Sequence, residues 1–141
     1  MKTTITIETI ISAPLELVWT CWTLPEHITQ WNEASDDWHT PTATNDLRVG
    51  GRFTSRMESR DGKYGFDFWG IHDEVQLNSL IKSTMGDDRK MEVRFIQEGS
   101  QVKVVESFET EDENNIELQK QGWQAILDRF KDYVESRGKL K

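Results

Sequence analysis

Apolar and polar side chains alternate with a period of two along several stretches of this chain, a pattern that predicts β-strands. The clearest stretch covers residues 52–60, where Phe53 and Met57 fall between charged and hydroxyl side chains. The Asp61-Gly62 pair that follows is typical of a tight hairpin turn. We therefore predict two antiparallel strands joined at this turn, each with one apolar and one polar face.

The apolar face of this hairpin is rich in aromatic residues. Tyr64, Phe66 and Phe68 continue it along the returning strand, whereas Trp69 falls with Asp67 on the opposite face. An apolar sheet face needs a cover in a folded domain. Whether that cover closes tightly or leaves a hole decides between a filled core and a binding cavity.

Four further stretches show a strand pattern, and segments rich in turn residues separate the last three. These stretches are residues 4–11, 77–85, 91–96 and 101–110. The segment 32–46 is polar, contains Pro41 and lacks periodicity, so it is predicted to be a loop. Its apolar residue Trp38 either anchors the loop on the core or lies against a ligand when the loop covers a pocket. The chain is expected to form about six strands, most of them joined as sequential antiparallel hairpins.

Two short helices are predicted after the first strand. The first opens at Pro14, with Ser12 or Ala13 as its cap, and runs through the apolar stretch LVWTCW. The second has Thr23 as its cap and Pro25 in its first turn, and it ends near Trp31.

The last third of the chain contains one long amphipathic helix. Residues 113–137 place apolar side chains at spacings of three, four and seven, and Thr110 with Glu113 matches a capping box. Gly122 lies inside this helix, where glycine costs about 1 kcal/mol relative to alanine. This glycine is tolerated by chance or marks a close approach to another element.

The helix of residues 113–137 carries the longest apolar stripe in the chain, so it is the expected cover for the aromatic sheet face. We predict an α+β domain in which a curved antiparallel sheet grips this helix. At 141 residues the chain is expected to form a single domain, residues 1–141, large enough to bury a core without disulfides or metals.

Composition limits the partners of the protein. The formal net charge is −8 and the pI is about 4.9, which disfavours nucleic acids and anionic membranes. The sequence lacks a signal peptide pattern and an apolar run long enough to cross a bilayer, so a cytoplasmic protein without membrane insertion is expected. Its partners are expected to be neutral, apolar or basic. Cys21 is the single cysteine and is predicted to be a buried, inert thiol.

Several short motifs, taken in order, resemble the activator of heat shock protein 90 ATPase homologue family of the START-like (SRPBCC) superfamily. They are Ile11-Ser12-Ala13-Pro14 with Val18-Trp19, the run Leu47 to Phe53, Asp61-Gly62, Gly70, and Gln121-Gly122-Trp123 before Leu127. The resemblance spans nearly the whole chain. It implies the helix-grip fold, with a hydrophobic cavity between the sheet and the C-terminal helix.

The same resemblance leaves the activity open. In the eukaryotic co-chaperone, a domain of this kind follows a separate chaperone-binding domain, whereas this sequence opens directly on its first predicted strand. Many stand-alone members resemble small-molecule binders, and the wider superfamily includes lipid carriers and polyketide cyclases. The resemblance implies a cavity without naming its ligand.

Glu106 is the strongest candidate for chemistry. In the stretch QVKVVESFET it shares the parity of Val102, Val104 and Phe108 rather than that of Lys103. Burial of a carboxylate on an apolar face is energetically unfavourable unless the group has a hydrogen-bond or charge partner or remains hydrated. Glu106 therefore either faces a cavity, as a ligand contact or an acid-base group, or a bulge turns it outward.

Other chemical motifs are weak. His27, His39 and His72 lack the spacing of a metal site and are expected at the surface or at helix ends, so neither a metal nor a cofactor is predicted. The serines show no catalytic triad pattern. Arg52, Arg56 and Arg60 form a basic row that is expected to be a solvated face paired with acids.

Three hypotheses follow, in order of preference. The first is binding of an apolar or aromatic small molecule, lipid-like or polyketide-like, without a need for catalysis. The second is a cyclase or hydratase that uses Glu106 in the same cavity, with Trp38, Tyr64 or His39 as helpers. The third is a module that regulates a chaperone ATPase. The predicted ligand-binding residues are Trp38, Phe53, Met57, Tyr64, Phe66, Phe68, Val104, Glu106, Trp123, Ile126, Leu127 and Phe130.

Overall fold

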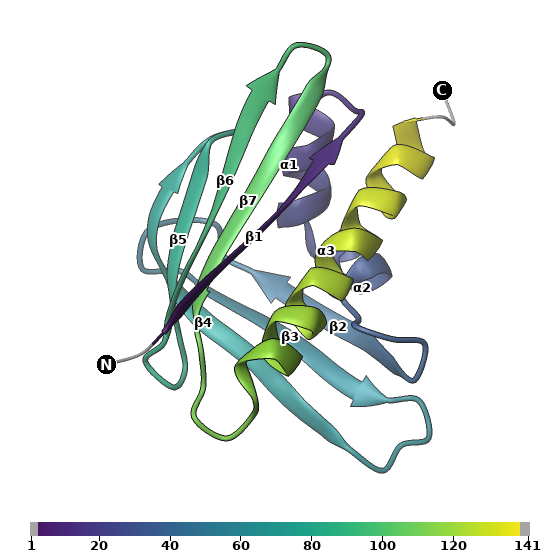
Figure 1. Cartoon of the computed structure of the whole chain (residues 1–141), viewed down its shortest axis with the longest axis vertical. Helices are drawn as coiled ribbons and strands as arrows, with labels where there is room; N and C mark the ends of the chain where they lie inside the picture. The colour runs from purple at the N-terminus through teal and green to yellow at the C-terminus, as the bar shows by residue number, and fades with distance from the viewer. Residues whose placement is uncertain (1–2, 139–141) are drawn as a thin grey trace.

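The fold is a curled antiparallel sheet with three helices packed on its concave side (Figure 1). The computed structural model describes residues 3–138. The strands are β1 (Thr4–Ile11), β2 (Trp38–Asn45), β3 (Arg52–Ser59), β4 (Gly65–Gln76), β5 (Leu80–Met85), β6 (Lys90–Glu98) and β7 (Gln101–Glu109). The helices are α1 (Leu15–Thr23), α2 (Pro25–Trp31) and α3 (Ile116–Gly138).

The order of strands in the sheet is β1-β7-β6-β5-β4-β3-β2, and every neighbouring pair is antiparallel. Helix α3 runs across the concave face, as the helix-grip prediction requires (Figure 1). The predicted fold class is therefore confirmed. Within residues 3–138 the sheet has seven strands rather than about six.

The additional strand is β2, which lies in the segment predicted to be a loop. It pairs only with β3 in the described sheet, so it forms an edge. Its ladder shifts register between His39 and Thr42, next to Pro41, and proline is tolerated at such edge positions and bulges. An edge strand interrupted in this way needs no regular apolar period, which is why the sequence pattern did not show it.

The hairpin between β3 and β4 forms at the predicted position. Gly62 adopts a φ of +78°, a left-handed conformation that glycine reaches without strain. The Asp61 carboxylate accepts hydrogen bonds from the Ser59 hydroxyl at 2.7 Å and from the Lys63 N–H at 3.0 Å. The turn therefore fixes the register that places Phe53, Met57, Phe66 and Phe68 on the concave face.

Several predicted element ends were wrong. Thr23 belongs to the last turn of α1, where its hydroxyl donates to the Trp19 carbonyl, and it does not cap α2. Helix α3 is capped by Asn115, whose side-chain oxygen accepts the N–H groups of Glu117 and Leu118, instead of by a box of Thr110 and Glu113.

The predicted strand of residues 77–85 also begins too early. Leu77 is 75% exposed and lies in the turn between β4 and β5, and β5 starts at Leu80. The prediction began the strand at Leu77 because this side chain is apolar, but Leu77 lies in the turn where the backbone reverses direction.

The concave side divides into a filled core and an open region. The filled core lies between β1, β6, β7, α1 and the C-terminal half of α3, where Val104, Leu127, Phe130 and Val134 are fully buried. The open region lies over β2 to β5 and the adjoining parts of β6 and β7, under the N-terminal half of α3. The sequence left a filled core and a cavity as alternatives, and the structure contains both.

Candidate functional site

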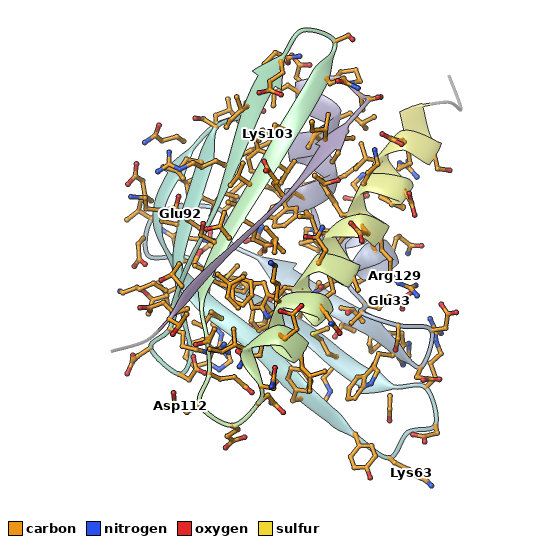
Figure 2. All side chains as sticks on the ribbon, in the orientation of Figure 1. Glu33, Lys63, Glu92, Lys103, Asp112 and Arg129 are labelled. Carbon is orange, nitrogen blue, oxygen red and sulfur yellow. The ribbon has the colours of Figure 1, made fainter. Side chains whose placement is uncertain are left out.

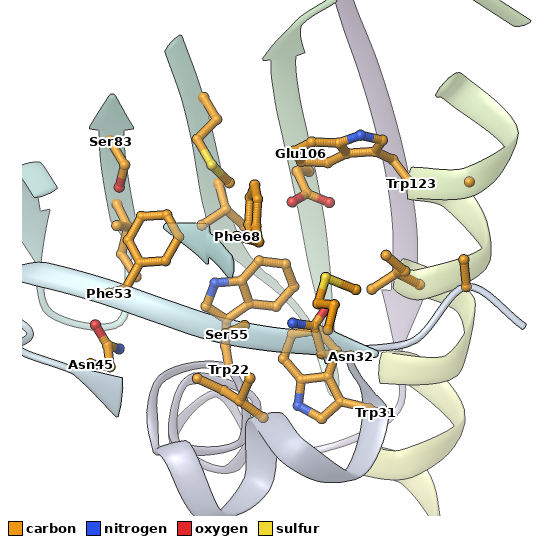
Figure 3. Close-up of a pocket in the computed structure, with 18 of the residues that line it drawn as sticks. Trp22, Trp31, Asn32, Asn45, Phe53, Ser55, Phe68, Ser83, Glu106 and Trp123 are labelled. Carbon is orange, nitrogen blue, oxygen red and sulfur yellow. The ribbon is translucent and has the colours of Figure 1, made fainter. Parts of the chain in front are cut away.

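The open region is a cavity of about 420 Å³. Its walls come from the inner faces of β2 to β7, from α1 and α2, and from the N-terminal half of α3 (Figure 3). Most of the lining is apolar and aromatic. A cavity of this size and lining is typical of sites for small organic molecules.

The cavity brings together eight of the twelve residues predicted to bind a ligand. Phe53, Met57, Phe66 and Phe68 line it from the β3–β4 hairpin. Trp38, Glu106, Trp123 and Ile126 line it from β2, β7 and α3. Shared parity on the strands and helical spacing on α3 are the reasons that these side chains converge.

The other four predicted residues lie away from the cavity. Tyr64 is 69% exposed, because it belongs to the turn before β4. Val104, Leu127 and Phe130 are fully buried in the filled core, and none of them lines the cavity. Parity and helical spacing identify the inward face of an element, but they do not say which end of that face is packed.

Gly122 accounts for part of the open space beside α3. A Cβ atom built at this position would have no neighbour within 4 Å, so the close approach considered from the sequence is absent here. Gly122 instead lines the cavity beside Trp123. The missing side chain keeps this part of the cavity open.

Glu106 faces the cavity, as its strand parity suggested. Its side chain is 6% exposed and its carboxyl group points into the space beside Phe68 and Trp123 (Figure 3). Among residues 3–138, no hydrogen bond or ion pair reaches this carboxyl group. Burial raises the pKa of Glu106 to about 8, because the charged form loses its hydration.

His72 is buried in the cavity wall, so the prediction that it lies at the surface was wrong. Its Nδ1 atom lies 3.0 Å from the Ser83 hydroxyl, and its Nε2 atom lies 2.7 Å from the Asn45 side-chain oxygen. The Asn45 amide group donates to the Thr23 carbonyl at 2.8 Å. With that orientation of Asn45, Nε2 carries the proton and Nδ1 accepts from Ser83. Burial lowers the pKa of His72, which favours this neutral form.

The pattern of β4 contained a sign of this role. Phe66, Phe68, Gly70 and His72 share one parity, so the inward face continues through the histidine. A Cβ atom on Gly70 would come within 2.7 Å of the Phe53 ring. The glycine therefore gives room for Phe53, which stacks on the His72 ring with centroids 5.3 Å apart.

Other lining residues were missed for a different reason. Trp22 and Trp31 come from α1 and α2, and they stack with ring centroids 5.1 Å apart. Asn45 and Ser83 come from strands that carry polar side chains inward. Their convergence depends on how the sheet curls, which no local pattern encodes.

The remaining titratable groups fit structural roles. His27 Nδ1 lies 2.6 Å from the Tyr133 hydroxyl, and His39 lies 4.0 Å from Glu58. Cys21 is buried, and burial raises the pKa of its thiol. Within the described chain, no group of three or more His, Cys, Asp or Glu side chains is arranged to hold a metal ion.

Two of the three arginines in the basic row on the convex face are paired with acids as expected. Arg56 lies 2.9 Å from Glu58, and Arg60 lies 3.1 Å from Glu33. The Arg52 guanidinium lies over the Trp69 ring, 4.1 Å from its centroid. Trp69 is therefore partly covered on the convex face by a cation–π contact rather than left open.

The segment between α2 and β2 forms part of the cavity wall and is held by arginines. Asn32 and Ala34 line the cavity. Arg129 of α3 donates to Glu33 at 3.1 Å and to Asp36 at 2.8 Å. Figure 2 shows Arg129 beside Glu33 at the edge of the domain. These ion pairs tie the segment to α3.

Comparisons with known proteins agree with this architecture. The fold and its cavity define a helix-grip domain of the START-like type. Residues 12–135 match the family described as activator of Hsp90 ATPase homolog 1-like protein, and the chain belongs to this family. No curated protein matches the sequence. No helix among the described residues is long and apolar enough to span a membrane.

Three solved structures illustrate the range of similarity. An AHSA1-like protein from Aeromonas hydrophila is 42% identical, with a TM-score of 0.90 and coverage of 96% of this chain and 94% of its own. A protein from Cytophaga hutchinsonii is 47% identical, with a TM-score of 0.82 and coverage of 95% and 93%. A protein from Nitrosomonas europaea shares the fold at 18% identity, with a TM-score of 0.81 and coverage of 95% of both chains.

Proposed function

We propose that this protein binds an apolar or aromatic small molecule in the cavity between the sheet and α3. The observation that carries the proposal is the cavity itself, about 420 Å³ in volume and walled mainly by aromatic and aliphatic side chains. Unfilled apolar space weakens a fold, because its lining loses van der Waals contacts. A bound molecule would restore those contacts.

The family supports the same function. START-like domains of this kind commonly bind hydrophobic ligands. The cavity also contains the buried Glu106 carboxyl group and the polar cluster of His72, Ser83 and Asn45. A few polar groups in an otherwise apolar cavity are typical of sites that orient a ligand.

A binding experiment with a cavity-filling variant tests this proposal. The protein is purified from its own host, examined by native mass spectrometry, and extracted under denaturing conditions to identify anything bound. Gly122→Phe places a ring where the structure has open space. Gln121→Phe is the matched control, because it adds the same ring to an exposed position on the same helix turn.

We expect a stoichiometric small molecule on the unmodified protein and on Gln121→Phe, and none on Gly122→Phe. An empty protein that also fails to bind a hydrophobic dye would contradict the proposal. Equal occupancy of both variants would place the molecule outside the cavity. An empty protein would favour the third hypothesis, a domain that acts on a chaperone ATPase through its surface.

Glu106 also supports a second candidate function, acid-base catalysis on the bound molecule. A carboxyl group with a pKa of about 8 retains its proton near neutral pH and can act as a general acid. Turnover of the extracted ligand would then be lost in Glu106→Gln, whereas binding would remain. Unchanged turnover in that variant would exclude Glu106 as the acid.

A further inference from the structure

We propose that the ligand of this cavity carries a positively charged ammonium group, held between the Glu106 carboxylate and the aromatic rings around it. This inference rests on the proposed function, because it specifies the ligand of the same cavity. It names a chemical class, an amphiphilic or aromatic cation, that the apolar lining alone does not select.

The first observation is the lack of a partner for Glu106. The side chain is 6% exposed and points into the cavity, and no described residue pairs with it. A buried carboxylate is strongly unfavourable unless a charge or a hydrogen-bond donor compensates it. A ligand cation would supply that compensation.

The second observation is that the other titratable groups of the cavity already have partners. His72 is bonded through both ring nitrogens to Ser83 and Asn45. Arg89 is paired with Asp87 at 2.7 Å and donates to the Glu109 carbonyl at 3.2 Å. Glu111 accepts a hydrogen bond from the Asn114 side chain. Glu106 therefore differs from the other titratable groups that line the cavity.

The charges of the lining residues indicate the sign of the charge that a ligand would carry. Arg89, Glu111, Glu106 and His72 are the titratable groups among the lining residues. Arg89 and Glu111 carry opposite charges, and burial keeps His72 neutral. Glu106 is therefore the group that decides the charge of the cavity, which becomes net negative when this carboxyl group ionises. The chain as a whole carries −8, which attracts cations and repels anions.

The third observation is the aromatic wall around the carboxyl group. Trp22, Phe53, Phe68 and Trp123 line the cavity from α1, β3, β4 and α3. Phe68 and Trp123 meet edge to face, with centroids 6.0 Å apart, next to Glu106 (Figure 3). Aromatic faces combined with a carboxylate form the usual environment for quaternary and substituted ammonium groups.

Proton linkage distinguishes a cation from a neutral ligand. The raised pKa of about 8 means that Glu106 is protonated in the empty cavity near neutral pH. Binding of a permanent cation would ionise it and release about 0.9 of a proton at pH 7. Affinity for that cation would then increase about fifty-fold from pH 6 to pH 8. A neutral ligand that accepts a hydrogen bond from the acid would release no proton.

A matched set of probes tests the inference. Two series of probes are used, one built on an alkyl chain and one on a naphthylethyl group. Within each series the three probes differ only in their terminal group, which is a trimethylammonium, an alcohol or a carboxylate. Binding is followed by tryptophan fluorescence and calorimetry in buffers of different ionisation enthalpy, which reports proton release. The proteins are the unmodified chain, Glu106→Gln and the control Glu113→Gln, which removes the same charge from an exposed site in front of α3.

We expect the ammonium probes to bind at least tenfold more tightly than the alcohols and to release a proton. Glu106→Gln should remove this preference while alcohol binding persists, and Glu113→Gln should keep it. Equal or tighter binding of alcohols or carboxylates to the unmodified protein would overturn the inference and leave the proposed function standing. Failure of every probe would count against both.

Discussion

The indole ring of Trp123 lies flat against the phenyl ring of Phe108, with centroids 3.9 Å apart and planes 9° from parallel. Phe108 is fully buried on β7, two residues after Glu106. Trp123 is near the N-terminal end of α3 and lines the cavity. The stack therefore fixes the helix to the sheet at the point where the filled core gives way to the cavity.

Replacement of Trp123 by alanine is expected to lower the free energy of unfolding by about 3 kcal/mol, because the stack and its buried area are lost. Dye binding in the cavity should weaken in the same variant. Urea unfolding and dye titration measure the two effects. Tyr64→Ala is the control, since Tyr64 is 69% exposed, and it should change stability by less than about 0.5 kcal/mol. Equal losses in both variants would contradict a structural role for the stack.

Glu106 should give the stability of the protein a recognisable pH dependence. Its pKa is raised to about 8 in the folded chain, so the folded state binds the proton more tightly than the unfolded state. The contribution of Glu106 to stability is therefore complete at acidic pH and declines as pH rises from its unfolded pKa of about 4.3 towards 8.

Glu106→Gln removes this titration. The unfolding free energy of the variant relative to the unmodified protein should rise with pH by about 1 kcal/mol per unit between pH 5 and pH 7. Urea unfolding at several pH values measures the difference, and the two proteins share every other titrating group. A difference that does not change with pH would show that the carboxyl group is hydrated or paired in solution.

Much of the cavity lining was predictable because strand parity is a local property. Phe53, Met57, Phe66, Phe68 and Glu106 each follow from the period of two. The same rule, applied to the end of β4, would also have placed His72 inward. The hairpin turn was predictable for a similar reason, since Asp61-Gly62 encodes its conformation directly.

The division between core and cavity was not predictable from local patterns. Val104 and Glu106 share a face of β7, yet Val104 is fully buried in the core and Glu106 lines the cavity. Trp123 and Phe130 likewise share a face of α3, yet Trp123 lines the cavity and Phe130 is fully buried in the core. The boundary depends on the distance between helix and sheet, which the curl of the whole sheet sets.

The hydrogen-bonded cluster of His72, Ser83 and Asn45 should stabilise the wall of the cavity. Asn45→Ala removes the partner of His72 Nε2 and the donor to the Thr23 carbonyl, so it is expected to cost about 2 kcal/mol. Urea unfolding measures this loss. Thr42→Ala, an exposed change on the same strand, is the control and should have little effect. A loss no larger than in that control would mean that water replaces Asn45.

The same cluster predicts the protonation of His72. Burial lowers its pKa in the folded chain, so the unfolded chain binds more protons just below the ordinary pKa of about 6.5. This contribution to stability is present above that pH and declines as pH falls, opposite in sign to that of Glu106. Nitrogen chemical shifts of the imidazole should show a neutral ring protonated at Nε2 at neutral pH. A charged ring at that pH would contradict the assigned hydrogen bonds.

Arg129 should control how fast a ligand reaches the cavity. Its guanidinium bonds Glu33 and Asp36, which flank the lining residue Ala34, and both partners belong to the segment between α2 and β2. These ion pairs lie at the surface and Glu33 keeps Arg60 as a second partner, so Arg129→Ala should change stability by only about 1 kcal/mol. The same change loosens the segment, which then keeps its Arg60 contact with Glu33. We expect dye association and dissociation to accelerate together while affinity stays within about twofold. Stopped-flow fluorescence measures both rates.

Arg94→Ala is the control, because it breaks a comparable ion pair with Glu92 on β6, and it should leave both rates unchanged. Identical rates in both variants would show that ligands enter by another route.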